Sequence, residues 1–322
     1  MASAIPLGSV LVVGGCGFLG HHIVKEILRR KEDQSPIVVL DSNTQRNRQS
    51  AVTYHQLDIA SYDQVLRVFA EVRPRVVFHT ASPSPFERDR VLLEKVNVNG
   101  TRNLIDSSVI HNQRSPLVDA TEELPVLHYP EQPEYYSHTK ALAEEIVLAA
   151  NRGAGRMLTV SIRPATLYGE GDGIITTNLC KQALSGRARF HFGHGKNLYD
   201  VAYVENCTYA QMLAAEALLR ASTTDPLPKE SRVEGEAFHV TDGVHVPFWG
   251  LQRLVAKIAG RPVQEEDARS VPRWLVMLAV MVAEWLYWLL TLGKKQPTVT
   301  RFSVDVVSGC VPRDDGDGNA PA

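Results

Sequence analysis

The sequence predicts an α/β fold, in which a doubly wound parallel sheet is followed by a smaller C-terminal region. An apolar strand at residues 10–13 runs through a glycine-rich turn into an amphipathic helix. A second apolar strand, at residues 37–41, ends in an acidic residue. Strands and helices then alternate over roughly the first third of the chain, a pattern that is typical of a parallel sheet with helices on both faces.

The first strand, turn and helix form a dinucleotide-binding pattern. Gly14 permits a tight turn, Gly17 allows the backbone to approach a pyrophosphate, and Gly20 permits close packing of the helix on the strand. Phe18 and Leu19 lie within this loop, at the start of the helix, where a phosphate is favoured. His21 and His22 follow, and they fit either a phosphate contact or an ordinary helix surface.

Asp41 ends the second strand about twenty residues further on, where the fingerprint requires an acidic residue. Its carboxylate can accept hydrogen bonds from the adenosine ribose and would repel a 2′-phosphate, so NAD is favoured over NADP. Arg46 and Arg48 follow in a polar loop and could bind the 2′-phosphate of NADP. A solvated surface loop is the simpler interpretation of these residues.

The next elements are a strand at 52–58, a helix from Ser61 to Val72, a strand at 75–83 and a helix from Arg88 to Ser107. Ligands bind at the C-terminal ends of parallel strands. The sequence therefore predicts a cofactor groove along the residues that follow these strands, namely Asp58, Ile59, Thr80, Ala81 and Ser82.

Tyr136 and Lys140 are four residues apart at the start of a helix that continues as KALAEEIVLAA. A lysine ammonium on the same helix face stabilises a tyrosinate, which can then act as an acid or base in alcohol oxidation. Such pairs also arise by chance on solvated helices. The cofactor motif upstream is what favours a catalytic pair here.

Composition excludes several classes of protein. Of the 322 residues 44% are hydrophobic, and the formal net charge is −2, which argues against a disordered chain and against a nucleic-acid-binding protein. Four cysteines, at positions 16, 180, 207 and 310, form no CxxC pair, so we expect a reducing compartment and no zinc site. His191 and His194 lack nearby carboxylates, and no metal is assigned. The first apolar stretch is expected to be a strand and not a signal peptide.

These motifs together resemble the 3β-hydroxysteroid dehydrogenase branch of the extended short-chain dehydrogenases, and within it the decarboxylating sterol-4α-carboxylate 3-dehydrogenases, fungal members included. The resemblance spans roughly residues 8 to 305. The matching segments are GGCGFLG, VVLD, HQLDIAS, VVFHTASP, VNVNGTRNLI, YSHTKALAEE, SIRPATLYGEGD, NLYDVAYVENCTYAQMLAAEAL and FHVTDGVHVPFW.

The resemblance implies a Rossmann-type domain and NAD-dependent oxidation of a 3β-hydroxyl on a sterol or triterpenoid, with loss of a C4 carboxylate where one is present. It implies Tyr136 as acid and base, Lys140 as the residue that activates it and holds the nicotinamide ribose, Asn99 in support, and Asp41 and Asp58 at the adenosine. Pro164, Tyr168 and Gly169 would line the nicotinamide end. A homodimer and a location on the cytoplasmic face of the endoplasmic reticulum or on lipid droplets are compatible with this family.

One departure from the family concerns a strand. The family has a further parallel strand between the VNVNGT helix and the tyrosine, and it ends in a serine that binds the reacting oxygen. Here no run of β-branched or apolar residues can form it. Ser108 is either a remnant of that serine segment or a residue of a helical turn. A catalytically impaired dinucleotide-binding protein, and a reductase or epimerase of another small molecule, therefore remain alternatives.

The second half has its own signature, an apolar segment at 274–292 with Arg273 before it and Lys294 and Lys295 after it. Its length suits a membrane-spanning helix, but Glu284 near the middle disfavours that location. A membrane-surface helix is the preferred interpretation, with a buried core helix and a transmembrane helix as alternatives. We expect the dinucleotide domain over 1–165 with return elements near 198–240, a substrate-binding region over 166–197 and 241–305, and a disordered tail over 306–322.

Overall fold

The computed structural model describes residues 5–30, 33–110, 128–131, 134–153, 155–193, 195–224, 227–228, 231–291, 299–301 and 304. The chain forms two units. The first contains Met1–Gly171 and Ala202–Asp242, and the second contains Asp172–Val201 and Gly243–Ala322. The expected tail over 306–322 and the segment 111–127 lie outside the described residues.

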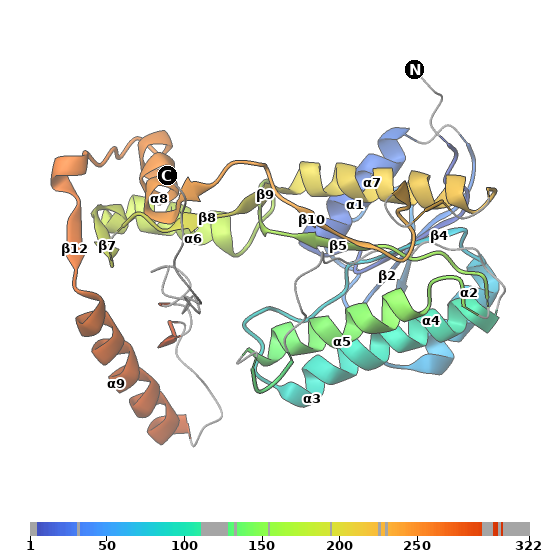
Figure 1. Ribbon diagram of the computed structural model, residues 1–322, viewed down its shortest axis with the longest axis horizontal. Helices are drawn as coiled ribbons and strands as arrows, with labels where there is room; N and C mark the ends of the chain where they lie inside the picture. The colour runs from blue at the N-terminus through green and yellow to red at the C-terminus, as the bar shows by residue number, and fades with distance from the viewer. Residues whose placement is uncertain are drawn as a thin grey trace. The chain divides into compact units, whose positions relative to one another are not determined.

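Parallel strands with helices on both faces make up the first unit, and this confirms the predicted fold class (Figure 1). The strands are β1 (Val10–Val13), β2 (Ile37–Asp41), β3 (Thr53–Gln56), β4 (Val76–His79), β5 (Ser161–Pro164), β6 (Thr166–Tyr168), β9 (Val201–Tyr203) and β10 (Ala237–Val240). The helices are α1 (Phe18–Arg30), α2 (Tyr62–Val72), α3 (Arg90–Leu93), the π-helix η1 (Glu94–Gly100), α4 (Thr101–Ile110), α5 (Tyr135–Ala149) and α7 (Val204–Ala221).

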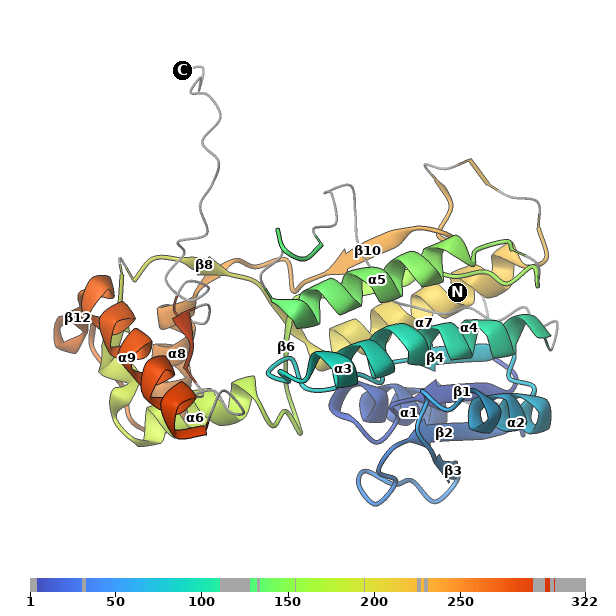
Figure 2. The same ribbon diagram turned by 90° about the horizontal axis from the view of Figure 1, so that it is seen from below.

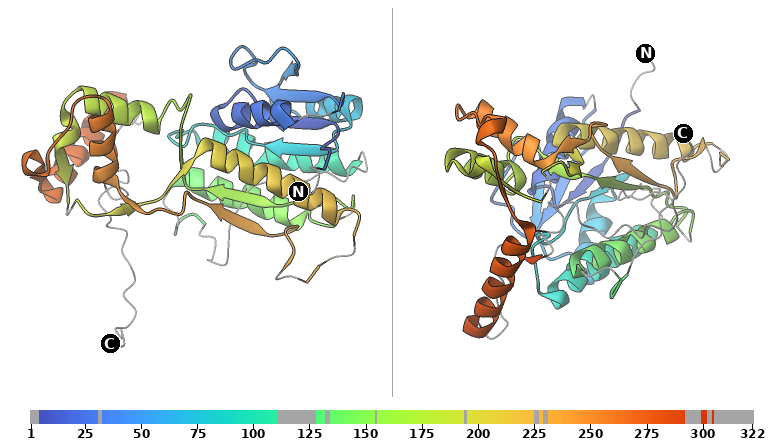
Figure 3. Two further views of the ribbon diagram at one scale, coloured as in Figure 1. Left: turned by 90° about the horizontal axis from the view of Figure 1, so that it is seen from above. Right: turned by 60° about the vertical axis from the view of Figure 1, so that its left-hand side comes forward.

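The four N-terminal strands lie in the order β3-β2-β1-β4, with β1 central and buried along its whole length. Alternate side chains of β1 enter two different cores. Leu11 and Val13 pack with α2, α4 and α5, which lie side by side in Figure 2. Val10 and Val12 pack with α1 and α7, which are adjacent in the left view of Figure 3. Both faces of the sheet are therefore covered, as near-continuous apolar strands require.

The parallel sheet is interrupted beyond β4 in the part of the chain that the structure describes. Among the described residues, β4 pairs only with β1, while β5 pairs in parallel with β10 in a separate two-stranded sheet. Helix α7 packs against both parts, because Met212 joins the core of the four-stranded sheet and Leu218 joins the core around β5. Helix packing thus connects two strand groups that no described ladder joins.

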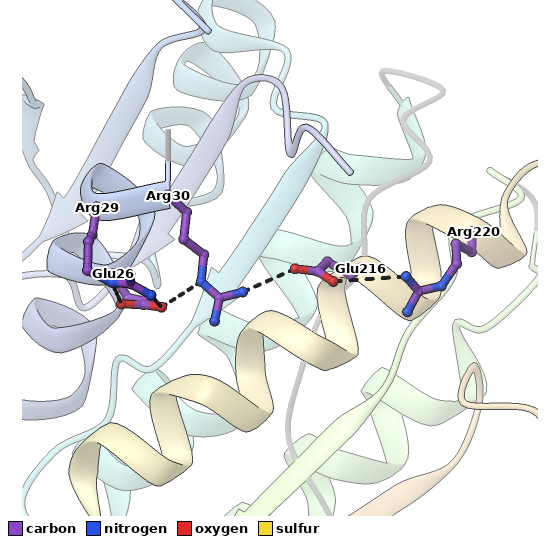
Figure 4. Close-up of polar contacts among 5 residues, drawn as sticks. All are labelled: Glu26, Arg29, Arg30, Glu216 and Arg220. Carbon is purple, nitrogen blue, oxygen red and sulfur yellow. Dashed lines mark hydrogen bonds and ion pairs between the residues drawn. The ribbon is translucent and has the colours of Figure 1, made fainter. Parts of the chain in front are cut away.

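An ion-pair network fastens α1 to α7 (Figure 4). Glu26 bonds Arg29 at 2.7 Å and Arg30 at 2.5 Å on its own helix, and Arg30 reaches Glu216 of α7 at 3.1 Å. Glu216 also faces Arg220 at 3.9 Å. The hydrogen bond from Arg29, with the bond and charge of Arg30, lowers the pKa of Glu26 to about 2 despite partial burial.

Short strands and helices build the second unit: α6 (Ile175–Leu184), η2 (Arg187–Arg189), β7 (Phe190–Phe192), β8 (Leu198–Tyr199), β11 (Val246–Pro247), α8 (Phe248–Ile258), η4 (Glu265–Asp267), β12 (Arg269–Val271) and α9 (Arg273–Thr291). Its interior joins α6 to α8, with Ala183 and Ala256 among the buried residues. Trp249 of α8 lies edge-on to Phe192, with ring centroids 4.7 Å apart.

Helix α9 is apolar and yet exposed. Its length and composition would allow it to cross a membrane, and Val280 is its one buried residue. Large apolar side chains are exposed around it, including Trp274, Trp285 and Trp288. Among the described residues little of α9 is buried, which disfavours the alternative of a buried core helix.

Candidate active site

The glycine turn is as narrow as a phosphate-binding loop must be. Gly14 has a φ of +83°, and a Cβ there would lie 2.6 Å from the backbone nitrogen of Ala81. A Cβ on Gly20 would lie 2.2 Å from the carbonyl oxygen of Gly14, so α1 can pack this closely on β1 only with glycine at that position. Gly17 is exposed, and a Cβ there would meet only the Gly14 carbonyl oxygen, at 3.1 Å. The turn therefore leaves accessible backbone at the N-terminus of α1, where Phe18 and Leu19 begin the helix.

Asp41 lies beside this turn at the end of β2. One carboxylate oxygen accepts a hydrogen bond from the backbone N–H of Cys16, at 3.0 Å, and the other accepts from Asn43, also at 3.0 Å. Burial, together with the Asp41 charge, raises the pKa of the Cys16 thiol to about 11. Cys16 is therefore an uncharged packing residue in the loop and no nucleophile.

The two arginines of the following loop differ in their contacts. The Arg48 guanidinium lies 4.4 Å from the centre of the Tyr54 ring and donates to the Thr44 carbonyl at 3.1 Å. Arg46 is exposed. Arg48 is thus engaged with its own loop, which weakens it as a candidate for binding a 2′-phosphate.

Asp58 and Ile59 follow β3 as predicted. Asp58 forms an ion pair with Lys95 of η1, with 2.6 Å between Nζ and Oδ2. The Lys95 hydrogen bond lowers the pKa of Asp58. Ile59 is buried against Gly100, where an added Cβ would lie 2.6 Å from its Cδ1. The sequence did not single out Lys95, which is a neighbour of Asp58 only in the folded chain.

Three residues after β4 connect the turn to the helices. The Thr80 hydroxyl donates to the Val13 carbonyl at 3.0 Å, and Ala81 lies against Gly14. The Ser82 hydroxyl donates to Oδ1 of Asn97 at 3.0 Å. These contacts place the end of β4 between the glycine turn and η1.

The structure brings Asn97, and not Asn99, to this site. Asn97 is 1% exposed, and its Nδ2 donates to the Thr139 hydroxyl of α5 at 3.0 Å. Asn99 lies on the exposed side of the same π-helix. The structure thus places Asn97 in contact with the helix that carries Tyr136, and the supporting role of Asn99 stays a prediction. The signal was present in the sequence, because Leu93, Asn97, Thr101 and Leu104 recur at helical spacing and place Asn97 on the apolar face.

Tyr136 and Lys140 lie in the first two turns of α5, and both are half-buried. Thr139, between them, links the helix to Asn97. One turn beyond Lys140, the buried Glu144 accepts a bond from Ser161 at 3.0 Å and a bidentate pair from Arg163, with 2.8 Å and 3.2 Å between the atoms. The residues of β5 thereby fix both the position and the rotation of the helix that carries the tyrosine and the lysine.

Ser108 does not belong to this site. It is 1% exposed within α4, and its hydroxyl donates to the Leu104 carbonyl at 2.8 Å. Helices α4 and α5 run in the same direction, since Asn97 meets Thr139 while Ile105 and Val147 share one core. Ser108 lies eleven residues after Asn97, which places it roughly 15 Å further along the helix. The predicted catalytic role of Ser108 is wrong for this reason, and the helical-turn alternative is correct.

The remaining predicted residues follow β5. Pro164 ends that strand, beside Val240 of β10. The Tyr168 hydroxyl donates to Asp242 at 2.9 Å, and the same carboxylate accepts from the Tyr203 backbone and the Asn206 side chain. Gly169 has a φ of +140°, and a Cβ there would meet Val204 at 2.7 Å. His22 bonds the Glu170 carbonyl at 2.9 Å, which favours a structural role over a phosphate contact.

Within the described part of the chain, no group of three or more His, Cys, Asp or Glu side chains is placed to hold a metal ion. His191 lies in β7 with its ring centroid 6.3 Å from that of Trp249. His194 and Cys310 lie outside the described residues.

The chain is similar in sequence to several known proteins. The profile of the 3-beta hydroxysteroid dehydrogenase/isomerase family matches residues 11–269. The sterol-4-alpha-carboxylate 3-dehydrogenase erg26, decarboxylating, of Schizosaccharomyces pombe is 31% identical over 318 residues, which cover 93% of this chain and 87% of that protein. The decarboxylating sterol-4-alpha-carboxylate 3-dehydrogenase of Bos taurus is 32% identical over 280 residues, covering 82% and 72%.

Solved structures show the same fold at lower identity. The UDP-glucose 4-epimerase of Thermus thermophilus, in complex with NAD, matches with a TM-score of 0.61 and 23% identity, covering 94% of this chain and 100% of that one. WbmH of Bordetella bronchiseptica, in complex with NAD+, matches with a TM-score of 0.62 and 17% identity, covering 82% and 85%.

Proposed function

This chain belongs to the 3-beta hydroxysteroid dehydrogenase/isomerase family, and from that premise we propose that it oxidises the 3β-hydroxyl of a sterol or triterpenoid with NAD. Where the substrate carries a carboxylate at C4, carbon dioxide is then lost. The names of relatives about 31% identical over almost the whole chain support this substrate class. The observation that carries the proposal is the Tyr136 and Lys140 pair on a helix anchored at Asn97 and Glu144.

The residues of the glycine turn fit a dinucleotide. Side chains on Gly14 and Gly20 would clash with backbone, and the exposed Gly17 leaves room for a pyrophosphate at the start of α1. Asp41 is placed by the Cys16 backbone so that its carboxylate faces the loop, which favours ribose hydroxyls and disfavours a 2′-phosphate. We therefore propose NAD as the preferred cofactor. When bound, NAD supplies the acceptor for the hydride that leaves C3.

The chain's own residues handle the proton. Tyr136 as tyrosinate takes the proton of the 3-hydroxyl, which leaves the oxygen electrons to form the C3 carbonyl. Lys140, one turn further on, stabilises the tyrosinate through its positive charge and holds the ribose next to the nicotinamide. Asn97 and Thr139 keep the helix in register, so that both side chains point to one place.

Decarboxylation needs little from the protein once the ketone exists. A C3 ketone next to a C4 carboxylate is a β-keto acid, so the bond between C4 and the carboxyl carbon breaks as its electrons form an enolate on the C3 oxygen. Protonation at C4 then gives the ketone product. The same Tyr136 hydroxyl, protonated in the first step, would donate a hydrogen bond to the enolate oxygen and so stabilise it.

Purified protein should produce reduced nicotinamide from NAD with a 3β-hydroxysterol and none with the 3α epimer. Tyr136→Phe should lose roughly 100-fold or more in kcat while it binds NAD as the wild type does. Tyr135→Phe is the control at the neighbouring position. The Tyr135 hydroxyl donates to Glu94, so we expect it to make no contact with the substrate. A folded, NAD-binding wild type with no turnover on any 3β-hydroxysterol would favour the dinucleotide-binding alternative.

We further propose that α9 lies on a membrane surface, on the cytoplasmic face of the endoplasmic reticulum or on lipid droplets. The apolar exposure of α9 supports this location. Glu284 in its middle binds both the backbone N–H and the side chain of Arg301, at 3.0 Å and 2.7 Å. The exposed Arg301 thus offsets the charge of Glu284, and an exposed ion pair at mid-helix suits a surface helix better than a spanning one. A sterol partitions into such a membrane.

A further inference from the structure

Asn47 lies in the loop that follows β2, and its side chain reaches back to the glycine turn. Its Nδ2 donates to the carbonyl oxygen of Cys16 at 2.9 Å, although the two residues are 31 positions apart. The Asn47 backbone is left-handed, with a φ of +53°. Asparagine adopts this conformation more readily than most residues that carry a side chain. The mechanism above gives Asn47 no role.

The bond from Asn47 completes the fixing of one peptide group, which joins Cys16 to Gly17. The N–H of this group belongs to Gly17 and donates to the Gly14 carbonyl at 2.9 Å. The carbonyl of the group belongs to Cys16 and accepts from Asn47. On the other side of Cys16, the backbone N–H donates to Asp41 at 3.0 Å. Asp41 and Asn47 therefore hold the Cys16 backbone at both of its ends.

A glycine turn needs such a hold, because glycine is flexible. Gly17 is exposed and has no Cβ, so the residue itself does little to limit rotation of the peptide group before it. Helix α1 begins at Phe18, and the first N–H groups of an α-helix have no partner within the helix. If the Cys16 carbonyl turned towards these donors, its oxygen would compete for them with a pyrophosphate and would repel the negative charge.

The loop that carries Asn47 is itself braced. The Arg48 guanidinium lies over the Tyr54 ring and donates to the carbonyl of Thr44, which is 5% exposed. The backbone N–H of Gln49 donates to the Tyr54 hydroxyl at 2.7 Å. The Asn47 amide is therefore held near the turn before a ligand binds, which lowers the entropy that binding must cost.

We propose that Asn47 is a positioning residue for the dinucleotide. By holding the Cys16 carbonyl, it keeps the glycine turn in the conformation that binds the pyrophosphate. The proposal rests on the cofactor site of the proposed function and extends that site to a residue outside the glycine fingerprint. Because the effect of Asn47 passes through the turn, it belongs to the affinity for the cofactor and not to the chemical step.

Asn47→Gly is the decisive variant, because glycine adopts a φ of +53° without strain and the substitution removes only the side chain. Gln45→Gly is the matched control. Gln45 is exposed in the same loop, so this substitution also makes the loop more flexible but leaves the Asn47 amide in place. In fluorescence titrations without sterol, Asn47→Gly should raise the Kd for NADH about 5- to 10-fold and Gln45→Gly at most about twofold. Equal Kd values in the two variants would overturn the proposal.

Two fragments of the cofactor identify the part that depends on Asn47. ADP carries the pyrophosphate, whereas adenosine carries only the base and the ribose. Asn47→Gly should weaken the displacement of NADH by ADP about 5- to 10-fold and leave displacement by adenosine within about twofold. An equal loss for adenosine would assign Asn47 to the ribose site at Asp41 and would contradict the proposal.

These titrations need no turnover, so they test Asn47 whether or not the wild type oxidises a sterol. Wild-type protein that binds no NADH would overturn the proposed cofactor and the role of Asn47 together. With an oxidised sterol in hand, Asn47→Gly should raise KM for NAD about 5- to 10-fold and keep kcat within about twofold. A loss confined to kcat would place Asn47 in the chemical step and contradict the proposal.

Discussion

At the scale of residues, spacing predicted the acid–base pair but not the residues that hold it. Tyr136 and Lys140 are adjacent on any helix, so their relation is visible in the sequence. Asn97 and Asn99 are two positions apart in a stretch that folds as a π-helix; helical spacing indicates that Asn97 lies on the apolar face, and only the fold shows that its amide reaches Thr139 of α5. Ser108 shows a second limit of spacing, because a serine in a helix can satisfy its own hydroxyl on the preceding turn and need not face a site.

The two asparagines give a matched test. Asn97→Ala removes the hydrogen bonds that the Asn97 amide makes with the hydroxyls of Ser82 and Thr139. Because α5 would lose one of its anchors, we expect kcat to fall about 10- to 100-fold. Asn99→Ala removes an exposed side chain and should leave kcat within about twofold. Steady-state kinetics on both variants, with melting temperatures to check folding, make the comparison. Equal losses in the two variants would show that Asn97 does not support the site.

Ser108→Ala is the companion test at the site of the missing strand. Its hydroxyl bonds only the Leu104 carbonyl among described groups, so the substitution should leave kcat and KM within about twofold. A loss of activity near that of Tyr136→Phe, in protein with an unchanged melting temperature, would restore the catalytic serine.

At the scale of elements, most of the first unit could be predicted. Strands β1, β2 and β4 are apolar runs of strand length, and α1 and α2 begin directly after glycine or serine turns. Local sequence patterns do not show which ion pairs join elements that are distant in the sequence. The pairs Arg30 with Glu216, Lys95 with Asp58, and Arg163 with Glu144 join residues far apart in the chain.

The network between α1 and α7 gives a prediction with a defined sign in pH. The pKa of Glu26 falls from an ordinary 4.5 to about 2 on folding, so its stabilisation is fully present above pH 4.5 and is lost as pH falls towards 2. Because Arg29 is exposed, solvent screens part of this interaction, and we expect Glu26→Gln to lower the free energy of unfolding by ~1 kcal/mol at neutral pH. The difference in this free energy between the wild type and the variant should shrink as the solution is acidified. Urea unfolding at pH 7 and pH 4 measures it.

Glu71→Gln is the control for that measurement, because Glu71 is exposed on α2 without a described ion pair. The control should change stability by a few tenths of a kcal/mol at most, at either pH. A difference between wild type and Glu26→Gln that grows on acidification would contradict the assignment of the stabilising pair.

At the scale of the whole molecule, the sequence predicts that a strand is missing, because no run of apolar, β-branched residues precedes the tyrosine, and the segment concerned, 111–127, lies outside the described residues. The described strands form one four-stranded sheet and four two-stranded sheets, and α7 packs both on the four-stranded sheet and on the core around β5. The exposure of α9 was not decidable from sequence, since a buried core helix and a membrane helix have similar composition. The ion pair of Glu284 with Arg301 likewise joins residues that no local pattern connects.

The membrane proposal belongs to this scale. Wild-type protein should float with liposomes of neutral and anionic phospholipid, and replacement of Trp285 and Trp288 by serine should lower the bound fraction about 10-fold or more. Leu184→Ser, on an exposed face of α6, is the control and should leave flotation unchanged. Flotation that is equally strong without the two tryptophans would assign membrane contact to another surface.

The central claim is that hydride leaves C3 of a sterol under the control of Tyr136. The most direct measurement uses a 4α-carboxy-3β-hydroxysterol with deuterium at C3, incubated with the purified protein and NAD. The account predicts deuterium in the reduced nicotinamide, a C3 ketone, and one carbon dioxide for each reduced cofactor, all lost in Tyr136→Phe. Folded, NAD-binding protein that leaves the deuterium on the sterol would contradict it.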